Sequence, residues 1–175
     1  MKTFGFILVG LLAVTLIAGL TCCSSTKNNK KMPPTGKLKS YSYSHSGTVA
    51  EPFRNYELQE LAPDTVQLAV RGISVDVADT IIVPHEVLDE VARMIIENKM
   101  YEYEESYQPS FEVLDGEGWH FFASYDDDNY VSSGGSNAWP PNASGLFTIT
   151  NYLDSCLIKY RKSGGGTPSS PSERR

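Results

Sequence analysis

The chain opens with one long apolar run and then alternates apolar and polar positions in patterns typical of strands. Residues 4–20 are almost entirely apolar or small and follow a single basic residue, Lys2. Residues 37–45 (KLKSYSYSH) alternate tyrosine with serine, and this period of two predicts a strand with one aromatic face. Two more strands are predicted at residues 56–61 and 65–71. Residues 79–83 (DTIIV) predict either a short strand or the entry to a helix.

Two amphipathic helices are predicted. The first begins at Pro84, since proline suits a first helical position. Acidic residues near its start would interact favourably with the helix dipole. The second begins at Ser144, a plausible N-cap. Apolar residues spaced three, four and seven positions apart predict a buried stripe on each helix. The first stripe contains Val87, Leu88, Val91, Met94, Ile95 and Ile96, and the second contains Leu146, Ile149, Thr150, Leu153, Cys156, Leu157 and Tyr160.

Between the helices, residues 101–118 are irregular and rich in tyrosine and glutamate, and a hairpin is predicted after them. Residues 119–125 and 130–133 form its strands, and residues 126–129 (DDDN) form its turn. The order of elements predicts an α+β fold, in which an antiparallel sheet of about five to six strands carries two helices packed on one face.

The first 23 residues, MKTFGFILVGLLAVTLIAGLTCC, combine a basic start, an apolar segment and closing cysteines. They resemble a bacterial lipoprotein signal peptide, in which a diacylglycerol is attached to the cysteine that becomes residue one of the mature chain. The register Leu20-Thr21-Cys22-Cys23 favours Cys23 as the lipidated residue, with Cys22 as the alternative. An uncleaved membrane anchor is a further alternative, although residues 4–20 fall slightly short of the roughly 20 that span a bilayer.

Composition divides the chain into four predicted segments. Residues 1–22 are the predicted signal peptide, residues 23–35 the lipidated cysteine and a flexible basic tether, residues 36–162 a single domain, and residues 163–175 a disordered tail. The predicted domain has a formal net charge of −11, although the whole chain has −6. Such an acidic surface argues against nucleic acid as a partner, because its binding relies on basic residues.

The last third of the chain carries a second resemblance. Residues 114–116 (LDG) followed by Trp119, the acidic turn, residues 132–135 (SSGG), residues 137–140 (NAWP) and the closing helix resemble a family of small lipoproteins of unknown function from Bacteroidales-type bacteria. This resemblance implies a lipoprotein signal followed by one α+β domain, and an envelope location. It implies no activity.

Residues 133–140 are the segment most suited to binding a ligand. Gly134 and Gly135 allow unusual backbone angles, Asn137 can bind its own chain or a ligand, and Trp139 offers an aromatic platform. The alternative is a structural corner in which Trp139 fills the core and Asn137 satisfies loop amides.

Other candidate chemistry is weaker. No metal or cofactor is predicted, because the histidines are scattered and residues 126–128 lack the spaced ligands of a calcium loop. Cys156 lies on an apolar stripe and is expected to be buried and inert. Thr65 and Thr80 follow aspartate and precede an apolar residue, a pattern that resembles the O-glycosylation acceptor of this bacterial group.

These observations predict a lipid-anchored, non-enzymatic protein of the cell envelope that binds an envelope protein or glycan. A hydrolase of envelope glycans or peptides and an inhibitor of an envelope enzyme are the alternatives. The lipid is expected to hold the protein on the outer membrane. Surface export in bacteria of this group resembles a rule that requires acidic residues just after the lipidated cysteine. Because residues 24–27 (SSTK) contain none, the resemblance implies that the domain faces the periplasm.

Overall fold

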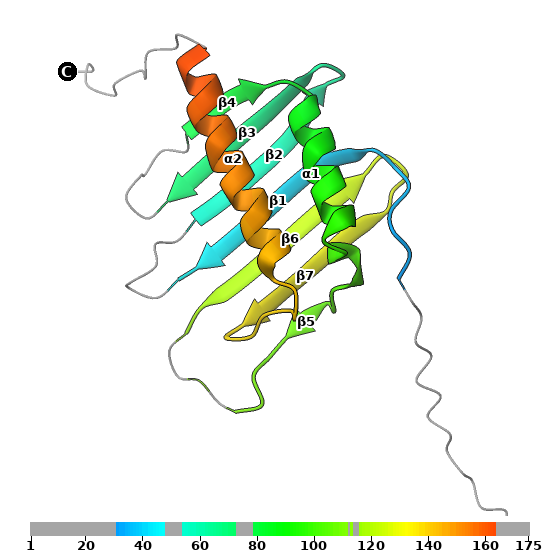
Figure 1. Cartoon of the computed structure of the whole chain (residues 1–175), viewed down its shortest axis with the longest axis vertical. Helices are drawn as coiled ribbons and strands as arrows, with labels where there is room; N and C mark the ends of the chain where they lie inside the picture. Colours follow the sequence, from blue (N-terminus) through cyan, green and yellow to red (C-terminus); the bar gives the residue numbers. More distant parts are fainter. Residues whose placement is uncertain (1–30, 48–53, 73–78, 112, 114–115, 164–175) are drawn as a thin grey trace, which may run out of the picture.

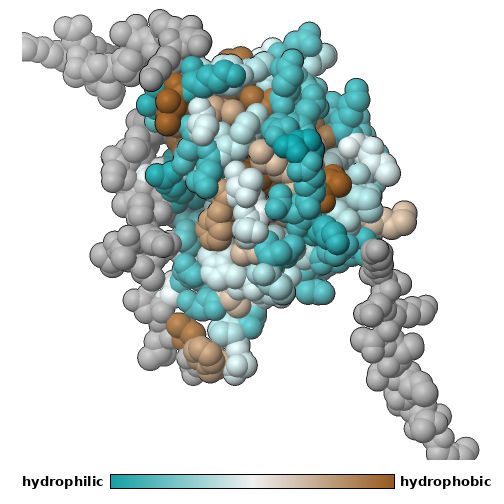
Figure 2. Space-filling view, in the orientation of Figure 1, coloured by the Kyte–Doolittle hydropathy of each residue, from teal (hydrophilic) through white to brown (hydrophobic). Residues whose placement is uncertain are grey.

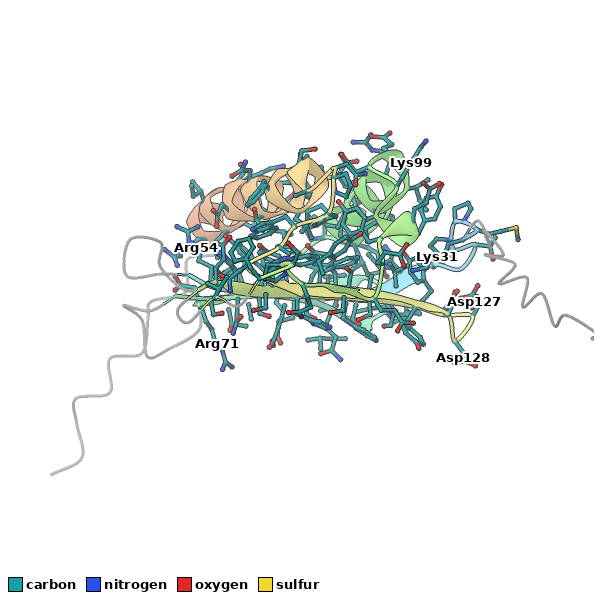
Figure 3. The ribbon with its side chains drawn as sticks, turned by 90° about the horizontal axis from the view of Figure 1, so that it is seen from below. Lys31, Arg54, Arg71, Lys99, Asp127 and Asp128 are labelled. Atoms are coloured by element: carbon teal, nitrogen blue, oxygen red, sulfur yellow. The ribbon has the colours of Figure 1, made fainter. Side chains whose placement is uncertain are left out.

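The computed structural model describes residues 31–47, 54–72, 79–111, 113 and 116–163. Its architecture is α+β, with one seven-stranded sheet and two helices. Figure 1 shows the helices lying side by side across the sheet, and Figure 3 shows that both cover the same face. The predicted signal peptide, both candidate lipidated cysteines and all but the first residue of the predicted tail lie outside the described residues.

The strand order is β4-β3-β2-β1-β6-β7-β5. Every neighbouring pair is antiparallel except β5 and β7, which run parallel. The strands are β1 (Leu38–Ser46), β2 (Arg54–Ala62), β3 (Thr65–Gly72), β4 (Asp79–Val83), β5 (Ser106–Tyr107), β6 (Gly118–Tyr125) and β7 (Tyr130–Ser136). The helices are α1 (Glu86–Glu97) and α2 (Ser144–Ser163), with a short 3-10 helix, η1 (Met100–Glu102), after α1.

The sheet corrects the sequence prediction in two respects: it has seven strands instead of five to six, and it is mixed instead of antiparallel. The extra strand, β5, has only two residues and lies within the segment predicted to be irregular. Such a short strand gives no periodic pattern, so only its pairing with Gly134 and Gly135 reveals it. The segment 79–83, which left two alternatives open, is a strand.

The core lies between the sheet and the helices, where the predicted alternation holds. Tyr41 and Tyr43 of β1 and Trp119 and Phe121 of β6 are buried on the helix-covered face. The predicted stripe of α1 is also buried, except that Ile96 is 36 % exposed. The buried members of the α2 stripe are Leu146, Ile149, Leu153 and Cys156. Neither helix in the described part of the chain is long and apolar enough to cross a membrane.

The acidic turn between β6 and β7 forms a tight hairpin. The Tyr125 N–H donates to the Asn129 carbonyl over 3.0 Å, leaving three aspartates in the loop. Asp128 takes the left-handed conformation, with φ of 61°, which three-residue hairpin loops require at this position. The Asp127 carboxylate accepts a hydrogen bond from the Asn129 N–H. The aspartates therefore shape the turn.

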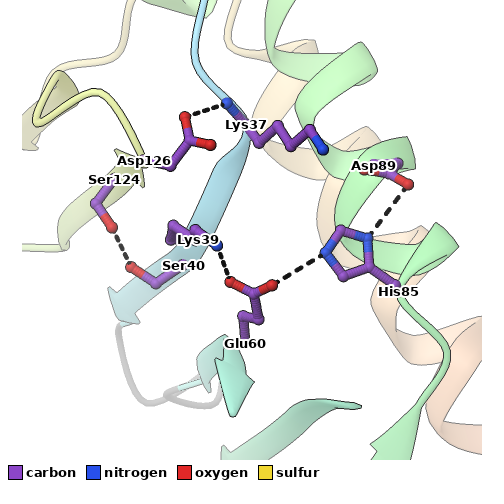
Figure 4. A network of polar contacts seen from close by, with 8 residues as sticks. All are labelled: Lys37, Lys39, Ser40, Glu60, His85, Asp89, Ser124 and Asp126. Atoms are coloured by element: carbon purple, nitrogen blue, oxygen red, sulfur yellow. Dashed lines mark hydrogen bonds and ion pairs between the residues drawn. The ribbon is translucent and has the colours of Figure 1, made fainter. Parts of the chain in front are cut away.

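A network of charged groups joins the start of α1 to the sheet (Figure 4). Glu60 of β2 pairs with Lys39 of β1, and its other carboxylate oxygen lies 3.5 Å from His85 Nε2. The His85 Nδ1 is 3.3 Å from Asp89 Oδ2 on α1. The proximity of Lys39 lowers the pKa of Glu60. His85 thus bridges α1 and β2.

Candidate functional site

Gly134 and Gly135 lie within β7 and not in a loop, because β7 continues to Ser136, three residues beyond its predicted end. The reason for glycine is local packing. A Cβ atom on Gly135 would lie 2.5 Å from the indole Nε1 of Trp119 and closer still to the Ala138 carbonyl oxygen. The indole N–H donates to that same oxygen over 2.8 Å. Glycine is therefore needed here to let Trp119 lie across β7.

Asn137 turns the chain out of β7. Its φ of 52° is in the left-handed region, which asparagine tolerates better than most residues. Its side-chain Oδ1 accepts from the Glu117 N–H over 2.9 Å, and its own N–H donates to the Glu117 carbonyl over 2.8 Å. Asn137 thus clamps the segment that enters β6, which is the structural role considered for it in the sequence.

Trp139 lies at the centre of an aromatic cluster. Its ring stacks on Trp119 with centroids 5.2 Å apart and planes 9° apart. The rings of Phe147 and His45 lie 5.5 Å and 5.6 Å away. One face of Trp139 is therefore covered by protein, and the residue is only partly buried. Ligand binding by residues 134–139 remains a prediction.

Glu117 connects the tryptophan to a histidine. Its Oε1 accepts from the Trp139 indole N–H over 2.6 Å, and its Oε2 lies 3.1 Å from His45 Nε2. His45 is only 9 % exposed, so this carboxylate is its polar partner inside the protein. The arrangement fixes the orientation of both rings.

Next to this cluster, a pocket of about 250 Å³ opens between α2 and the adjoining ends of β1 and β2. Its lining residues are Tyr43, His45, Arg54, Tyr56, Phe147, Thr150, Asn151 and Asp154. Figure 2 shows that the surface on the helix side is mostly hydrophilic, with small, separate apolar patches. The pocket combines apolar and hydrophilic surface, because it places aromatic rings next to an ion pair.

The ion pair crosses from the sheet to α2. Arg54 Nη1 donates to Asp154 Oδ2 over 2.6 Å and to Tyr56 Oη over 3.1 Å. The Tyr56 hydroxyl donates to the other carboxylate oxygen, Oδ1, over 3.0 Å. Contact with Tyr56 and Asp154 raises the pKa of Arg54, whereas burial is the main cause that raises the pKa of Tyr56. Arg54 and Tyr56 therefore remain protonated near neutral pH.

The sequence did not identify this pocket. Its ion pair joins Arg54 to Asp154, which are separated by 100 positions along the chain. One signal was present: His45 continues the buried alternation of Tyr41 and Tyr43. A histidine at a buried strand position requires a polar partner, but the sequence does not indicate which one.

The other predicted sites lie elsewhere. Cys156 is buried on α2, as predicted, and burial raises the pKa of its thiol. Thr80 is exposed on the edge strand β4, and Thr65 is partly exposed at the start of β3. Their glycosylation remains a prediction. Among the described residues, no group of three histidine, cysteine or acidic side chains is placed to hold a metal ion.

Comparison with known proteins adds no family to this description. The sequence matches no protein-family profile and is not detectably similar to any curated protein.

Proposed function

We propose that this chain is a lipid-anchored protein of the cell envelope whose α+β domain binds saccharides. The anchor rests on the first 23 residues, which have the basic start, apolar segment and cysteines of a lipoprotein signal. The binding role rests on one observation: the pocket between α2 and the β1 and β2 ends joins aromatic rings to a neutralised ion pair. The ligand is an envelope glycan.

The chemistry of the pocket favours a neutral, hydroxyl-rich ligand. Arg54 and Asp154 cancel each other's charge, yet both side chains are about a third or more exposed and retain capacity for further hydrogen bonds. Asn151 and Thr150 add donors and acceptors along α2. Phe147 is 47 % exposed and supplies an apolar face. A sugar ring has the same two characters, since its C–H face packs on an aromatic ring and its hydroxyls bind polar groups.

The size of the pocket suits a small part of a glycan. Pockets for drug-sized ligands usually enclose about 300–1,000 Å³. This pocket, of about 250 Å³, is slightly smaller and open to solvent on one side of α2. A single sugar residue fits such a volume, and the remainder of the glycan would extend outside.

The carboxylates of the site also favour binding over hydrolysis. Both oxygens of Asp154 accept hydrogen bonds from Arg54 and Tyr56, and both oxygens of Glu117 contact Trp139 or His45. A hydrolase of glycans typically places one carboxyl group to protonate the leaving oxygen and another to attack or activate water. Here both groups serve to orient neighbouring side chains.

The binding claim is tested with the full-length chain in detergent on an array of envelope glycans and simple saccharides. We expect Phe147→Ala and Asp154→Asn each to reduce binding about tenfold or more, because each removes one of the two kinds of contact. The matched control is Ile158→Ala, since Ile158 is also an exposed apolar residue of α2 but lies outside the pocket. Absence of glycan binding, or equal loss in all three variants, would refute the proposal.

The anchor and its orientation are tested separately. Mass spectrometry of the mature N-terminus would identify a diacylglycerol on Cys23, and a lipid on Cys22 would contradict that register. Because residues 24–27 (SSTK), immediately after Cys23, include no acidic side chain, we propose that the domain faces the periplasm from the outer membrane. Protease added to intact cells should then leave the domain whole, whereas its rapid digestion would indicate surface exposure.

A further inference from the structure

The outer edge of β7, on the side away from β6, is only partly paired. Strand β5 covers only part of it, since Ser106 and Tyr107 pair with Gly134 and Gly135. The first four residues of β7, Tyr130–Ser133, have no strand beside them within the described part of the chain. A half-covered edge is unusual, because exposed edges are normally shortened, charged or covered.

The backbone groups of this open edge can be assigned from the register. In the antiparallel pair of β6 and β7, alternate residues direct both their N–H and C=O groups toward the partner strand or away from it. The Gly134 N–H donates outward to the Glu105 carbonyl over 3.1 Å. Ser132 and Tyr130 have the same parity, so their N–H and C=O groups also face outward. No backbone hydrogen bond joins them to another described residue.

A groove of about 690 Å³ runs along these outward groups. One wall is residues 129–132 of the turn and β7, and Tyr101 and Glu105 extend it toward β5. The opposite wall is the segment Lys31–Thr35, which we call the N-terminal strap. Lys31 holds the strap in place by donating to the Tyr103 carbonyl, and Thr35 donates to Asp127 over 3.3 Å.

We propose that this groove binds an extended peptide segment of a partner protein, which adds to the sheet as a strand beside Tyr130–Ser133. The outward groups of Tyr130 and Ser132 would hydrogen-bond its backbone, continuing the ladder that β5 begins. Alternate side chains of the peptide would meet the apolar surfaces of Met32, Tyr101 and Tyr130, of which Met32 and Tyr130 are strongly exposed. We therefore expect an apolar residue at every second position of the peptide.

Two observations favour a single peptide over a second copy of this chain. The N-terminal strap walls the groove, which leaves room for one extended segment but obstructs the edge of a whole second sheet. In addition, β5 occupies the end of the same edge, so two copies could pair along only four residues. The groove is also remote from the saccharide pocket, because Figure 3 shows Lys31 and Arg54 on opposite sides of the domain.

The test uses the full-length chain in detergent and a phage-displayed library of random eight-residue peptides. We expect enrichment of peptides with alternating apolar residues. Hydrogen exchange followed by NMR then gives a residue-specific signature: a bound peptide should slow exchange of the Tyr130 and Ser132 amides at least tenfold. The Val131 and Ser133 amides, which face β6, should be protected with or without peptide.

A pair of variants supports this measurement. Ser132→Pro removes the outward N–H but no bond to β6, a position at which edge strands tolerate proline, and it should weaken peptide binding about tenfold or more. Ser132→Ala keeps the N–H and should bind as the unaltered chain does. Should the proline variant fail to fold, amide hydrogen exchange of the unaltered chain, with and without peptide, still tests the proposal.

Three results obtained with peptides would overturn the proposal. They are the absence of any enriched peptide, enriched peptides that leave the Tyr130 and Ser132 amides exchanging freely, and equal affinity of the proline and alanine variants. Protection of the same two amides in the chain alone, increasing with protein concentration, would instead identify a second copy as the occupant and would also refute it.

Discussion

Replacing Gly135 with alanine would put a methyl group into space that Trp119 already occupies. The new Cβ would lie 2.5 Å from the Trp119 indole nitrogen, a separation that real Cβ atoms do not adopt, and closer still to the Ala138 carbonyl. One of these atoms belongs to the backbone and cannot swing aside. Relief of both contacts requires the backbone at Ala138 to shift and the indole ring to move, and the 2.8 Å hydrogen bond between them would be lost.

The expected cost follows from these two effects. Overfilling a packed core costs about 1–3 kcal/mol, and the lost hydrogen bond adds about 0.5–1.5 kcal/mol. We therefore expect Gly135→Ala to lower the free energy of unfolding by about 1.5–4.5 kcal/mol. Neighbouring glycines provide a graded control. A Cβ on Gly134 would come within 3.1 Å of its nearest neighbour, the Trp119 carbonyl oxygen, and one on Gly118 within 3.1 Å of only the movable Ser46 hydroxyl.

Urea denaturation followed by tryptophan fluorescence measures all three variants, because Trp119 and Trp139 stack at this site. The order of destabilisation should be Gly135→Ala first, Gly134→Ala second and Gly118→Ala last. A cost below about 1 kcal/mol for Gly135→Ala, the lower limit for overpacking, would show that the ring relocates easily and that the packing argument is wrong. Equal costs at Gly135 and Gly118 would contradict it as well.

Three further predictions concern single groups. Burial raises the pKa of the Cys156 thiol, so native protein at neutral pH should react with a thiol reagent far more slowly than urea-unfolded protein, and equal rates would contradict its burial. The buried Tyr125 hydroxyl has no hydrogen-bond partner among the described residues, so Tyr125→Phe should preserve or raise the thermal midpoint; Tyr103→Phe, which removes a 2.8 Å bond to the Asn142 carbonyl, should lower it. Hydrogen bonds from Asn129 lower the pKa of Asp127, so the stabilising contribution of its carboxylate is present above the unfolded pKa of about 4 and is lost as the pH falls through the folded pKa. In urea titrations, Asp127→Asn should therefore lose less stability between pH 6 and pH 3 than the unaltered chain does. The same loss of stability in both proteins would argue against that interaction.

Much of the fold could be predicted because its signals are local. The alternation around Tyr41 and Tyr43 gave β1, and the spacing of Val87, Val91 and Ile95 gave α1. The end of β7 was missed for a physical reason. Glycine is a poor strand former, so Gly134 and Gly135 were interpreted as loop, whereas tertiary packing of Trp119 demands glycine inside the strand.

The candidate site was harder to predict because it is assembled from distant positions. Trp139 was identified as an aromatic residue of interest, and it does lie beside the pocket through Phe147 and His45. Arg54 and Asp154 carried no such signal. Their pairing depends on where α2 crosses the end of β2, and neither segment encodes that crossing alone.

The position of β1 has a mechanical consequence for a chain held by its N-terminus. It is the first strand of the described part of the chain, yet it lies inside the sheet, with hydrogen bonds to β2 on one side and β6 on the other. Tension transmitted from the proposed anchor would load both ladders in shear, so that many hydrogen bonds resist together. Were the first strand at an edge, the same pull could peel it away from a single neighbour. The topology thus places a strand that is paired on both sides next to the proposed tether.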